Sequence, residues 1–414
     1  MRRLPVFFCV ILLSAILTGC AVPVGVPLIR QYTAESLQST PEPDGTVVPD
    51  AEADALTSPV TDPFLGVDIS FLALGDNLIH PNIYMDAKKR STEEKEYDFL
   101  PVYADIADAV AAADFAFINQ ETVMAGASYG YSGYPQFNTP QQLGLDLVTL
   151  GFDIINIANN HMLDMGTQGL IDTVNFWKEQ PVTLLGADYE PTEPVMLEKD
   201  GVKIAMLSYT YSTNGMVQRS DAAVKAPYID RDRILSEIET VKKRQADVII
   251  ASVHWGIENT HKPTEEQKEL AQLMADAGVD VILGHHSHCL QPIEWLTGAG
   301  GQETLCIYSL GNCISGMAAP LNQIGGMFTF SLVSDGTGGV CVDNPLFIPT
   351  VFYYGPGWFN THLYLMEDYT EEIAATHGVQ INGYTLSAEK ARQIVTDVMD
   401  PQFLPEWLRA EEEQ

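Results

Sequence analysis

The chain has 414 residues, of which 22 are Lys or Arg and 55 are Asp or Glu, giving a formal net charge of −33. Because the negative charge is spread along the whole chain, it argues against nucleic acid or an anionic membrane surface as a direct electrostatic partner. The length is sufficient for one large α/β domain with or without a C-terminal appendage.

The first twenty residues have the pattern of a bacterial export signal. Arg2 and Arg3 precede an uninterrupted apolar stretch that ends in LTGC, as is typical of a signal peptide. LTGC is similar to the bacterial lipobox, in which the cysteine is acylated and becomes the mature N-terminus. We therefore expect residues 1–19 to be a lipoprotein signal peptide and Cys20 to anchor an extracytoplasmic protein to the cell membrane. The alternatives are an ordinary signal peptide and an uncleaved membrane helix.

Residues 20–66 are rich in Pro, Thr, Asp and Glu and lack a sustained apolar period. A segment of this composition buries too little apolar surface to order itself. We interpret it as a tether between the membrane and the folded domain; a longer irregular N-terminal arm is the alternative.

Short apolar runs beyond residue 66 alternate with segments of helical period. The predicted strands are residues 67–74, 114–118, 152–158, 202–210, 247–253, 279–284 and 304–310. Helices are predicted at 101–113, 166–180 and 264–277, the last beginning with Thr264 and Gln267 in capping-box spacing. Alternating strands and helices predict an α/β layered fold with a largely parallel or mixed sheet. We expect one domain over residues 67–333, with the strands and helix of residues 334–414 packed on it.

Polar side chains follow almost every predicted strand at the point where the strand ends. They are Asp76, Asn119, Glu121, Asn160, His161, Asp164, His254, Glu258, His286, His288 and Asn312. Taken singly, each is weak evidence, because Asp and Asn are common in turns and a lone histidine is more often part of a core. Ligands of open α/β sheets bind outside the carboxyl ends of the strands, so the sequence predicts one shared site.

The composition of this site favours a bound cation. Buried carboxylates that are neither paired nor metal-bound are costly, and these segments contain hardly any Lys or Arg to pair them. Oxygen and imidazole ligands without thiolate suit Mn, Fe or Zn. Alternate residues of extended backbone point in opposite directions, so His286 and His288 both serve as ligands only where the chain curls around an ion or lies between two. His285 is expected to pack or hydrogen-bond instead.

Six ordered motifs carry a family resemblance. The segments LALGD, NQE, IANNHMLDMGTQGL, HWGIE, GHHSHCLQPIE and YSLGN resemble the bacterial capsule-synthesis CapA family, associated with poly-γ-glutamate capsule, over about residues 69–314. The resemblance implies a calcineurin-like metallophosphoesterase-type sandwich of two mixed sheets flanked by helices. It also implies a centre of one or two divalent ions that activates water.

The resemblance assigns roles to individual residues. It implies that Asp76, Glu121, Asn160, His254, His286 and His288 are metal ligands. It further implies that His161 protonates the leaving group or steadies the transition state, with Asp164 orienting it. Candidates for lining the site or orienting these ligands are Asn119, Glu258, Gln291, Glu294 and Asn312.

One ligand implied by the phosphoesterase pattern is missing. Those proteins place a histidine two residues after the first aspartate, and this chain has Leu78 there, with His80 offset by two. Glu121 also stands where the phosphoesterases have an aspartate. A single-ion centre and a weakly occupied two-ion centre are both compatible with this set.

Two functions remain open at this point. The first is a surface-anchored, metal-dependent hydrolase or transferase of capsule biosynthesis, acting on a phosphoester or on an amide of an anionic polymer. The second is a non-catalytic, membrane-anchored component of a capsule synthesis or export complex, in which the crevice binds polymer or is only structural. Tyr129, Tyr131 and Tyr134 form either a substrate wall or a packed loop. The disulfide state of Cys289, Cys306, Cys313 and Cys341 is also open.

Overall fold

The computed structural model describes residues 62–187 and 193–409. The predicted signal peptide, Cys20 and the tether up to residue 61 lie outside the described residues. Within the described ranges, no helix combines the length and the apolar character needed to cross a membrane.

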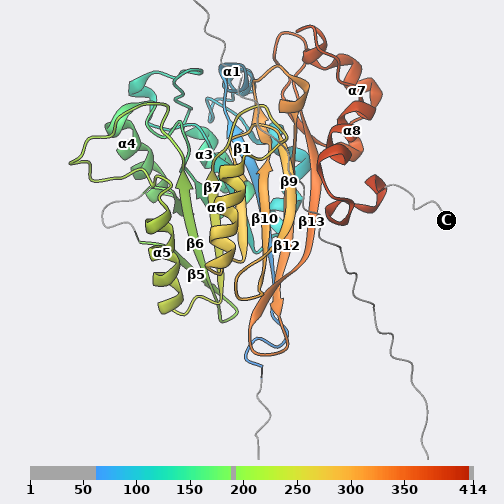
Figure 1. Ribbon diagram of the computed structural model, residues 1–414. Helices are drawn as coiled ribbons and strands as arrows, with labels where there is room; N and C mark the ends of the chain where they lie inside the picture. The colour runs from blue at the N-terminus through green and yellow to red at the C-terminus, as the bar shows by residue number, and fades with distance from the viewer. Residues whose placement is uncertain (1–61, 188–192, 410–414) are drawn as a thin grey trace, which may run out of the picture. The chain divides into compact units, whose positions relative to one another are not determined.

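Two mixed β-sheets form the centre of the domain (Figure 1). The larger sheet has the order β14-β13-β12-β1-β2-β3-β4, with β11 paired to the end of β1. Its strands are β1 (Asp68–Leu78), β2 (Phe115–Gln120), β3 (Ile154–Asn156), β4 (Thr183–Leu185), β11 (Asn312–Ser315), β12 (Ile324–Ser334), β13 (Val340–Tyr353) and β14 (His362–Leu365). Strands β1 to β4 are parallel, whereas β12, β13 and β14 extend the sheet with antiparallel pairing.

The second sheet has the order β5-β6-β7-β8-β10-β9. Its strands are β5 (Val195–Lys199), β6 (Val202–Thr210), β7 (Val248–His254), β8 (Val281–His285), β9 (Leu290–Thr297) and β10 (Glu303–Leu310). The four central strands are parallel, and the edge strands β5 and β9 are antiparallel to their neighbours. The central strands are buried along almost their whole length, which explains their near-continuous apolar sequences.

Eight α-helices lie within the described ranges. They are α1 (Pro81–Lys89), α2 (Ala107–Ala112), α3 (Gln142–Leu150), α4 (Gly166–Lys178), α5 (Arg231–Lys243), α6 (Glu265–Asp276), α7 (Glu371–Thr376) and α8 (Ala388–Val398). Helix α6 begins with the predicted capping box. The Thr264 side chain accepts from the backbone N–H of Gln267, and the Gln267 side chain accepts from the backbone N–H of Thr264. Helices α5 and α6 lie beside one another across the second sheet (Figure 1).

Alternating side chains of the second sheet divide the apolar interior into two cores. Val248 and Ile250 of β7 pack in the core shared with the larger sheet, whereas Ile249 of the same strand packs with Ile238 of α5 and Met274 of α6. Both faces of the second sheet are therefore covered. The structure therefore confirms the layered α/β sandwich that was predicted from the sequence.

Candidate metal centre

The carboxyl ends of the parallel strands from both sheets meet at one place. Asp76 lies near the end of β1 and Glu121 directly follows β2, both in the larger sheet. His254 ends β7, and His286 and His288 follow β8 in the second sheet. All five side chains are almost fully buried. The structure thus brings together acidic and imidazole groups that lie far apart in the sequence.

Glu121 occupies the middle of this cluster. Its Oε1 lies 3.5 Å from Nε2 of His254 and 3.7 Å from Nε2 of His288. Both carboxylate oxygens of Glu121 are buried without a hydrogen-bond partner. Burial raises the pKa of this carboxyl. An unsatisfied buried carboxylate facing imidazoles is what a cation-binding site contains, because a cation removes the cost of burial.

Asp76 is held by donors from both sheets. Its Oδ1 accepts from Nδ2 of Asn119 at 2.8 Å, and Asn119 in turn accepts from Asn156 at 2.8 Å. Its Oδ2 accepts from the backbone N–H of His286 at 3.1 Å and lies 3.2 Å from Nδ1 of His288. Although burial raises the pKa of Asp76, the hydrogen bond and charge of His288 outweigh that effect and hold it well below its usual range. Asp76 is therefore a carboxylate.

An unusual backbone aims the two histidines of the H-x-H sequence. His286 has φ of 95° and His288 has φ of 54°, both in the left-handed region that non-glycine residues seldom adopt. Such conformations cost about 1–3 kcal/mol each and are concentrated at functional sites. The curled backbone lets both rings face the cluster. This is the condition under which the sequence analysis expected His286 and His288 to serve together as ligands. His285 instead stacks on Phe117, with ring centroids 5.7 Å apart.

Burial also fixes the protonation of two histidines. It lowers the pKa of His254 to about 3 and that of His286 well below the ordinary value. Both imidazoles are therefore neutral near pH 7, which is the form that binds a metal. Although burial lowers the pKa of His288, the charges of Glu121 and Asp76 raise it to about 10.

The donor atoms define two neighbouring positions for an ion. One is surrounded by Asp76, Glu121 and His288, and the other by Glu121, His254 and His286, with the donors of each group within 4.8 Å of one another. Oδ1 of Asn160 lies 2.9 Å from Nε2 of His254 and so borders the second position. Glu121 belongs to both positions. The residues present therefore fit one or two divalent ions with Glu121 between them.

A histidine–aspartate pair lies beside the cluster. Nδ1 of His161 is 2.8 Å from Oδ2 of Asp164, which also accepts from the backbone N–H of Phe137 at 2.7 Å. The His161 ring packs edge-on against Phe137, with centroids 4.8 Å apart. Asp164 therefore fixes the ring and its Nδ1 proton, and directs Nε2 to be the nitrogen available for proton transfer.

A cavity of about 480 Å³ opens at this edge of the domain. Its walls include His161, Asp164, Asn160, Glu258 and Tyr134. Tyr129 instead donates to Asp172, and Tyr131 packs against Tyr84 and Tyr97. Of the three tyrosines in this loop, Tyr134 is the one placed to contact a bound molecule.

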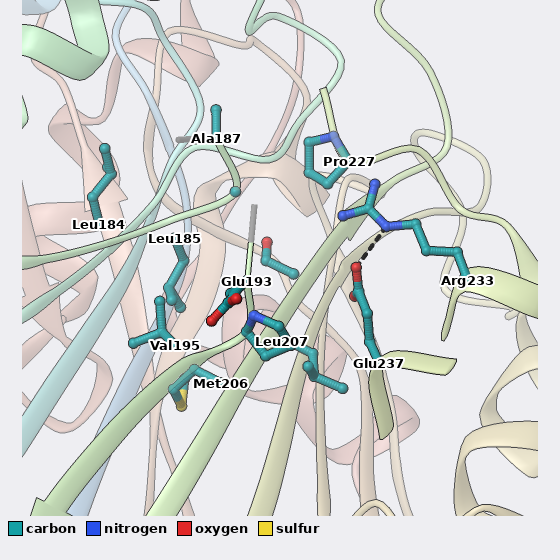
Figure 2. A pocket seen from close by; sticks show the side chains of 13 residues that line it. Leu184, Leu185, Ala187, Glu193, Val195, Met206, Leu207, Pro227, Arg233 and Glu237 are labelled. Atoms are coloured by element: carbon teal, nitrogen blue, oxygen red, sulfur yellow. Dashed lines mark hydrogen bonds and ion pairs between the residues drawn. The ribbon is translucent and has the colours of Figure 1, made fainter. Parts of the chain in front are cut away.

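A second hollow, of about 70 Å³, lies between β4, β5 and β6 (Figure 2). Its lining is largely apolar, and its charged groups include Arg233, which donates to Glu237 at 2.7 Å. None of the predicted site residues lines it. Among the described residues, this hollow is therefore separate from the candidate metal centre.

Two residues that were predicted to line the site or orient its ligands, Asn312 and Gln291, make hydrogen bonds that hold other parts of the site in place. Asn312 supports His288, because its Oδ1 lies 3.1 Å from Nδ1 of that ring and its Nδ2 donates to the His288 carbonyl. Gln291 accepts from Gln267 and donates to the carbonyls of Thr260 and Lys262. It therefore fastens the loop that follows β7.

The placement of Glu294 at the site is wrong. Glu294 is exposed in the middle of β9, the edge strand of the second sheet, whereas its neighbour Ile293 is buried. Because side chains alternate along a strand, burial of Ile293 turns Glu294 to solvent. Proximity in sequence to the histidines suggested the role.

The sequence did not single out three polar residues that contact the cluster. Tyr211 directly follows β6, and its ring centroid lies 4.6 Å from that of His286. Asn214 accepts from Nδ2 of Asn160 at 3.2 Å, and Asn156 supports Asn119. The rule that functional side chains follow strands would have found Tyr211. No signal marks Asn214, which lies in a turn.

The fold and the site define a class of protein, namely a two-sheet α/β sandwich with a candidate metal centre and an adjacent His–Asp pair. Residues 70–317, more than half of the chain, match the family described as bacterial capsule synthesis protein PGA_cap. The chain belongs to this family, and the resemblance seen in the sequence is confirmed.

Two relatives from Bacillus have informative names. The chain is 34% identical over 197 residues to the PGA biosynthesis protein CapA of Bacillus subtilis, covering 46% of this chain and 50% of the relative. It is 31% identical over 196 residues to the capsule biosynthesis protein CapA of Bacillus anthracis, covering 45% and 46%. The alignment spans about half the length of each relative.

Among solved structures, the NAD nucleotidase of Haemophilus influenzae overlaps with 82% of this chain and 57% of its own. The TM-score is 0.44 and the sequence identity is 12%.

Proposed function

We propose that this protein is a metal-dependent hydrolase of capsule or surface-polymer biosynthesis. The observation that carries the proposal is the unsatisfied Glu121 carboxylate, which shares one ion position with the neutral imidazoles of His254 and His286 and lies next to the His161–Asp164 pair. This combination supports an ion and a proton donor at one cavity. The substrate is an anionic polymer such as poly-γ-glutamate, cleaved at an amide, or a phosphoester.

Mn, Fe or Zn is the proposed cofactor, because the donors are carboxylate oxygen and imidazole nitrogen without thiolate. A bound divalent ion would polarise the bond under attack and lower the pKa of a water molecule. Asp76, Glu121 and His288 would hold one ion. Glu121, Asn160, His254 and His286 would hold another.

The chain's own groups supply the proton transfer. The proposed role of His161 is to donate a proton from Nε2 to the leaving group, since Asp164 holds Nδ1 at 2.8 Å. Asn160 and Asn214 present carboxamides to the same side of the cavity, and no Lys or Arg is among the residues that line it. The carboxamides of Asn160 and Asn214 suit a substrate that offers amide groups, because each carboxamide both donates and accepts.

The process and the location are part of the proposal. Membership of the family and the names of the two Bacillus relatives support a role in capsule synthesis, together with other proteins of such a complex. The LTGC sequence supports anchoring through Cys20 at the outer face of the cell membrane. A protein with net charge −33 that handles a polyanion requires cations between the two.

The test combines metal analysis with two hydrolysis assays. The purified protein, reconstituted with Mn²⁺ or Zn²⁺, is assayed on bis(p-nitrophenyl) phosphate and on poly-γ-glutamate, beside His161→Ala. We expect bound metal in both proteins and turnover of one substrate that falls at least about 100-fold in His161→Ala. Bound metal with equal background rates in both proteins would favour the non-catalytic component of a capsule complex. Absence of bound metal would contradict the proposed centre itself.

A further inference from the structure

Glu258 lies next to the proposed centre but belongs to neither of the two ion positions described above. One of its carboxylate oxygens is within 4.8 Å of donor nitrogens of both His286 and His288, which are likewise within 4.8 Å of one another. His286 is shared with one ion position and His288 with the other. Glu258 therefore lies close to one histidine of each position and, unlike the buried Glu121, it is exposed.

Backbone hydrogen bonds fix the loop that carries Glu258. This loop follows β7, and Trp255 N–H donates to the His285 carbonyl at 3.3 Å. Asn259, in the left-handed region with φ of 60°, donates its N–H to the Ser287 carbonyl at 2.8 Å. The loop is thus joined to the histidine segment on both sides of Glu258. The proximity of the carboxylate to the imidazoles follows from this pairing of backbones.

Glu258 has no competing partner in residues 62–187 and 193–409. Its side chain makes no hydrogen bond there and no ion pair with Lys or Arg, and the residue is exposed on the wall of the 480 Å³ cavity. In the same group, His286 has a buried Nδ1 without a hydrogen-bond partner and is only 2% exposed. A buried, unpartnered nitrogen near an exposed carboxylate is an arrangement that a bound cation would satisfy.

The two ion positions have few donors of their own. The position formed by Asp76, Glu121 and His288 has three donors from the carboxylate and imidazole set, and it shares His288 with the group that contains Glu258. One additional carboxylate raises the number of donors and adds negative charge to balance a second divalent ion.

We propose that Glu258 is a metal ligand of this chain, reaching the centre from the cavity side through the loop after β7. The inference rests on the proposed metal centre and adds a donor to it. As the exposed member of the ligand set, Glu258 controls access to the ion from the cavity. It also places a negative charge where a substrate enters.

The experiment measures metal binding and needs no substrate. Co²⁺ and Mn²⁺ are titrated into the metal-free full-length protein, with calorimetry for affinity and stoichiometry and the visible spectrum of Co²⁺ for coordination. The variants are Glu258→Gln, Glu258→Asp and, as a matched control, Glu294→Gln on the exposed face of β9. Thermal unfolding without metal checks that each variant is folded.

We expect Glu258→Gln to weaken binding of one ion by about 10–100-fold and to alter the Co²⁺ spectrum. Glu258→Asp should lie between Gln and wild type, and Glu294→Gln should match wild type. Wild-type affinity, stoichiometry and spectrum in Glu258→Gln would overturn the inference while leaving the centre intact. If wild type binds no ion and Glu121→Gln behaves identically, the centre and this inference both fall.

Discussion

The backbone N–H of His286 donates to Oδ2 of Asp76 at 3.1 Å, joining residues 210 positions apart, one in β1 of the larger sheet and the other directly after β8 of the second sheet. Asp76 therefore also stabilises the fold, in addition to its proposed role as a metal ligand, because it accepts a second hydrogen bond from Asn119. Substitution of Asp76 would mix loss of a ligand with loss of these contacts. Glu121 makes no hydrogen bond through its carboxylate and is the cleaner residue to change.

The metal-free protein should become more stable when Glu121 is replaced by leucine. The change removes an unsatisfied buried carboxylate, whose burial costs about 1–3 kcal/mol, and keeps a side chain of similar size. We expect Glu121→Leu to raise the melting temperature in EDTA and to abolish the further increase that Mn²⁺ or Zn²⁺ gives to wild type. Thermal unfolding measures both. A variant that melts below wild type in EDTA would count against this account of Glu121.

Asp164→Asn should reduce catalysis without removing metal. Asn accepts through Oδ1 or donates through Nδ2, so the variant no longer reliably holds the proton on Nδ1 of His161. We expect turnover to fall by about 100-fold or more, with unchanged metal content by elemental analysis. Loss of metal from this variant would show that Asp164 supports the ligands instead of the proton donor.

Gly75→Ala should destabilise the edge where β1 and β11 meet. A Cβ at Gly75 would lie 2.0 Å from the carbonyl oxygen of Gly311, which accepts from the N–H of Asp76 at 2.9 Å. Because backbone atoms have little freedom to move aside, we expect a loss of about 1–3 kcal/mol in the free energy of unfolding, together with weaker metal binding.

Gly300→Ala provides the control for this substitution. Its Cβ would meet only the flexible side chain of Gln302, and the residue is exposed. Denaturant unfolding should therefore show a much smaller change. Equal effects of the two substitutions would refute the importance of the close approach at Gly75.

Asp280 directly precedes β8, at the opposite end of this strand from His286, and should make stability depend on pH. Burial raises its pKa to about 6, although Oδ2 accepts from the backbone N–H of Ile249 at 2.7 Å. A raised carboxyl pKa contributes stability that is complete below about pH 4 and is lost as pH rises through about 6. Asp280→Asn keeps an acceptor and removes the charge.

We therefore expect Asp280→Asn to stabilise the protein by about 1–2 kcal/mol near pH 7.5 and to have little effect near pH 3.5, below the ordinary pKa of an aspartate. Urea unfolding at the two pH values measures the difference. A stabilisation that is equal at both values would mean that ionisation of Asp280 is not its cause.

The sequence was sufficient to predict the buried parallel strands and their common functional edge. Seven predicted strands correspond to β1, β2, β3, β6, β7, β8 and β10, because strands covered on both faces are continuously apolar. It did not reveal β5 or β9. Strand β9 contains Pro292 and the exposed Glu294, which an edge strand tolerates and which hide its period.

Local patterns also left the distribution of strands between two sheets undecided, and only the family resemblance implied a pair of sheets. The pairing of β1 with β12 and of β8 with β10 depends on contacts that no short segment contains. Asn156 and Asn214 were missed for the same reason. Each acts on the site through another side chain, and neither directly follows a predicted strand.

The ligand set takes Asp76 and Glu121 from one sheet and His254, His286 and His288 from the other. An ion shared by Glu121 and these histidines is therefore a reversible cross-link between the two halves of the sandwich. The four cysteines of the described residues are all free thiols, so among those residues no disulfide makes such a link. The concentration of metal would then determine how strongly the strand ends of the two sheets are held together, while the apolar core holds the remainder of the two sheets together.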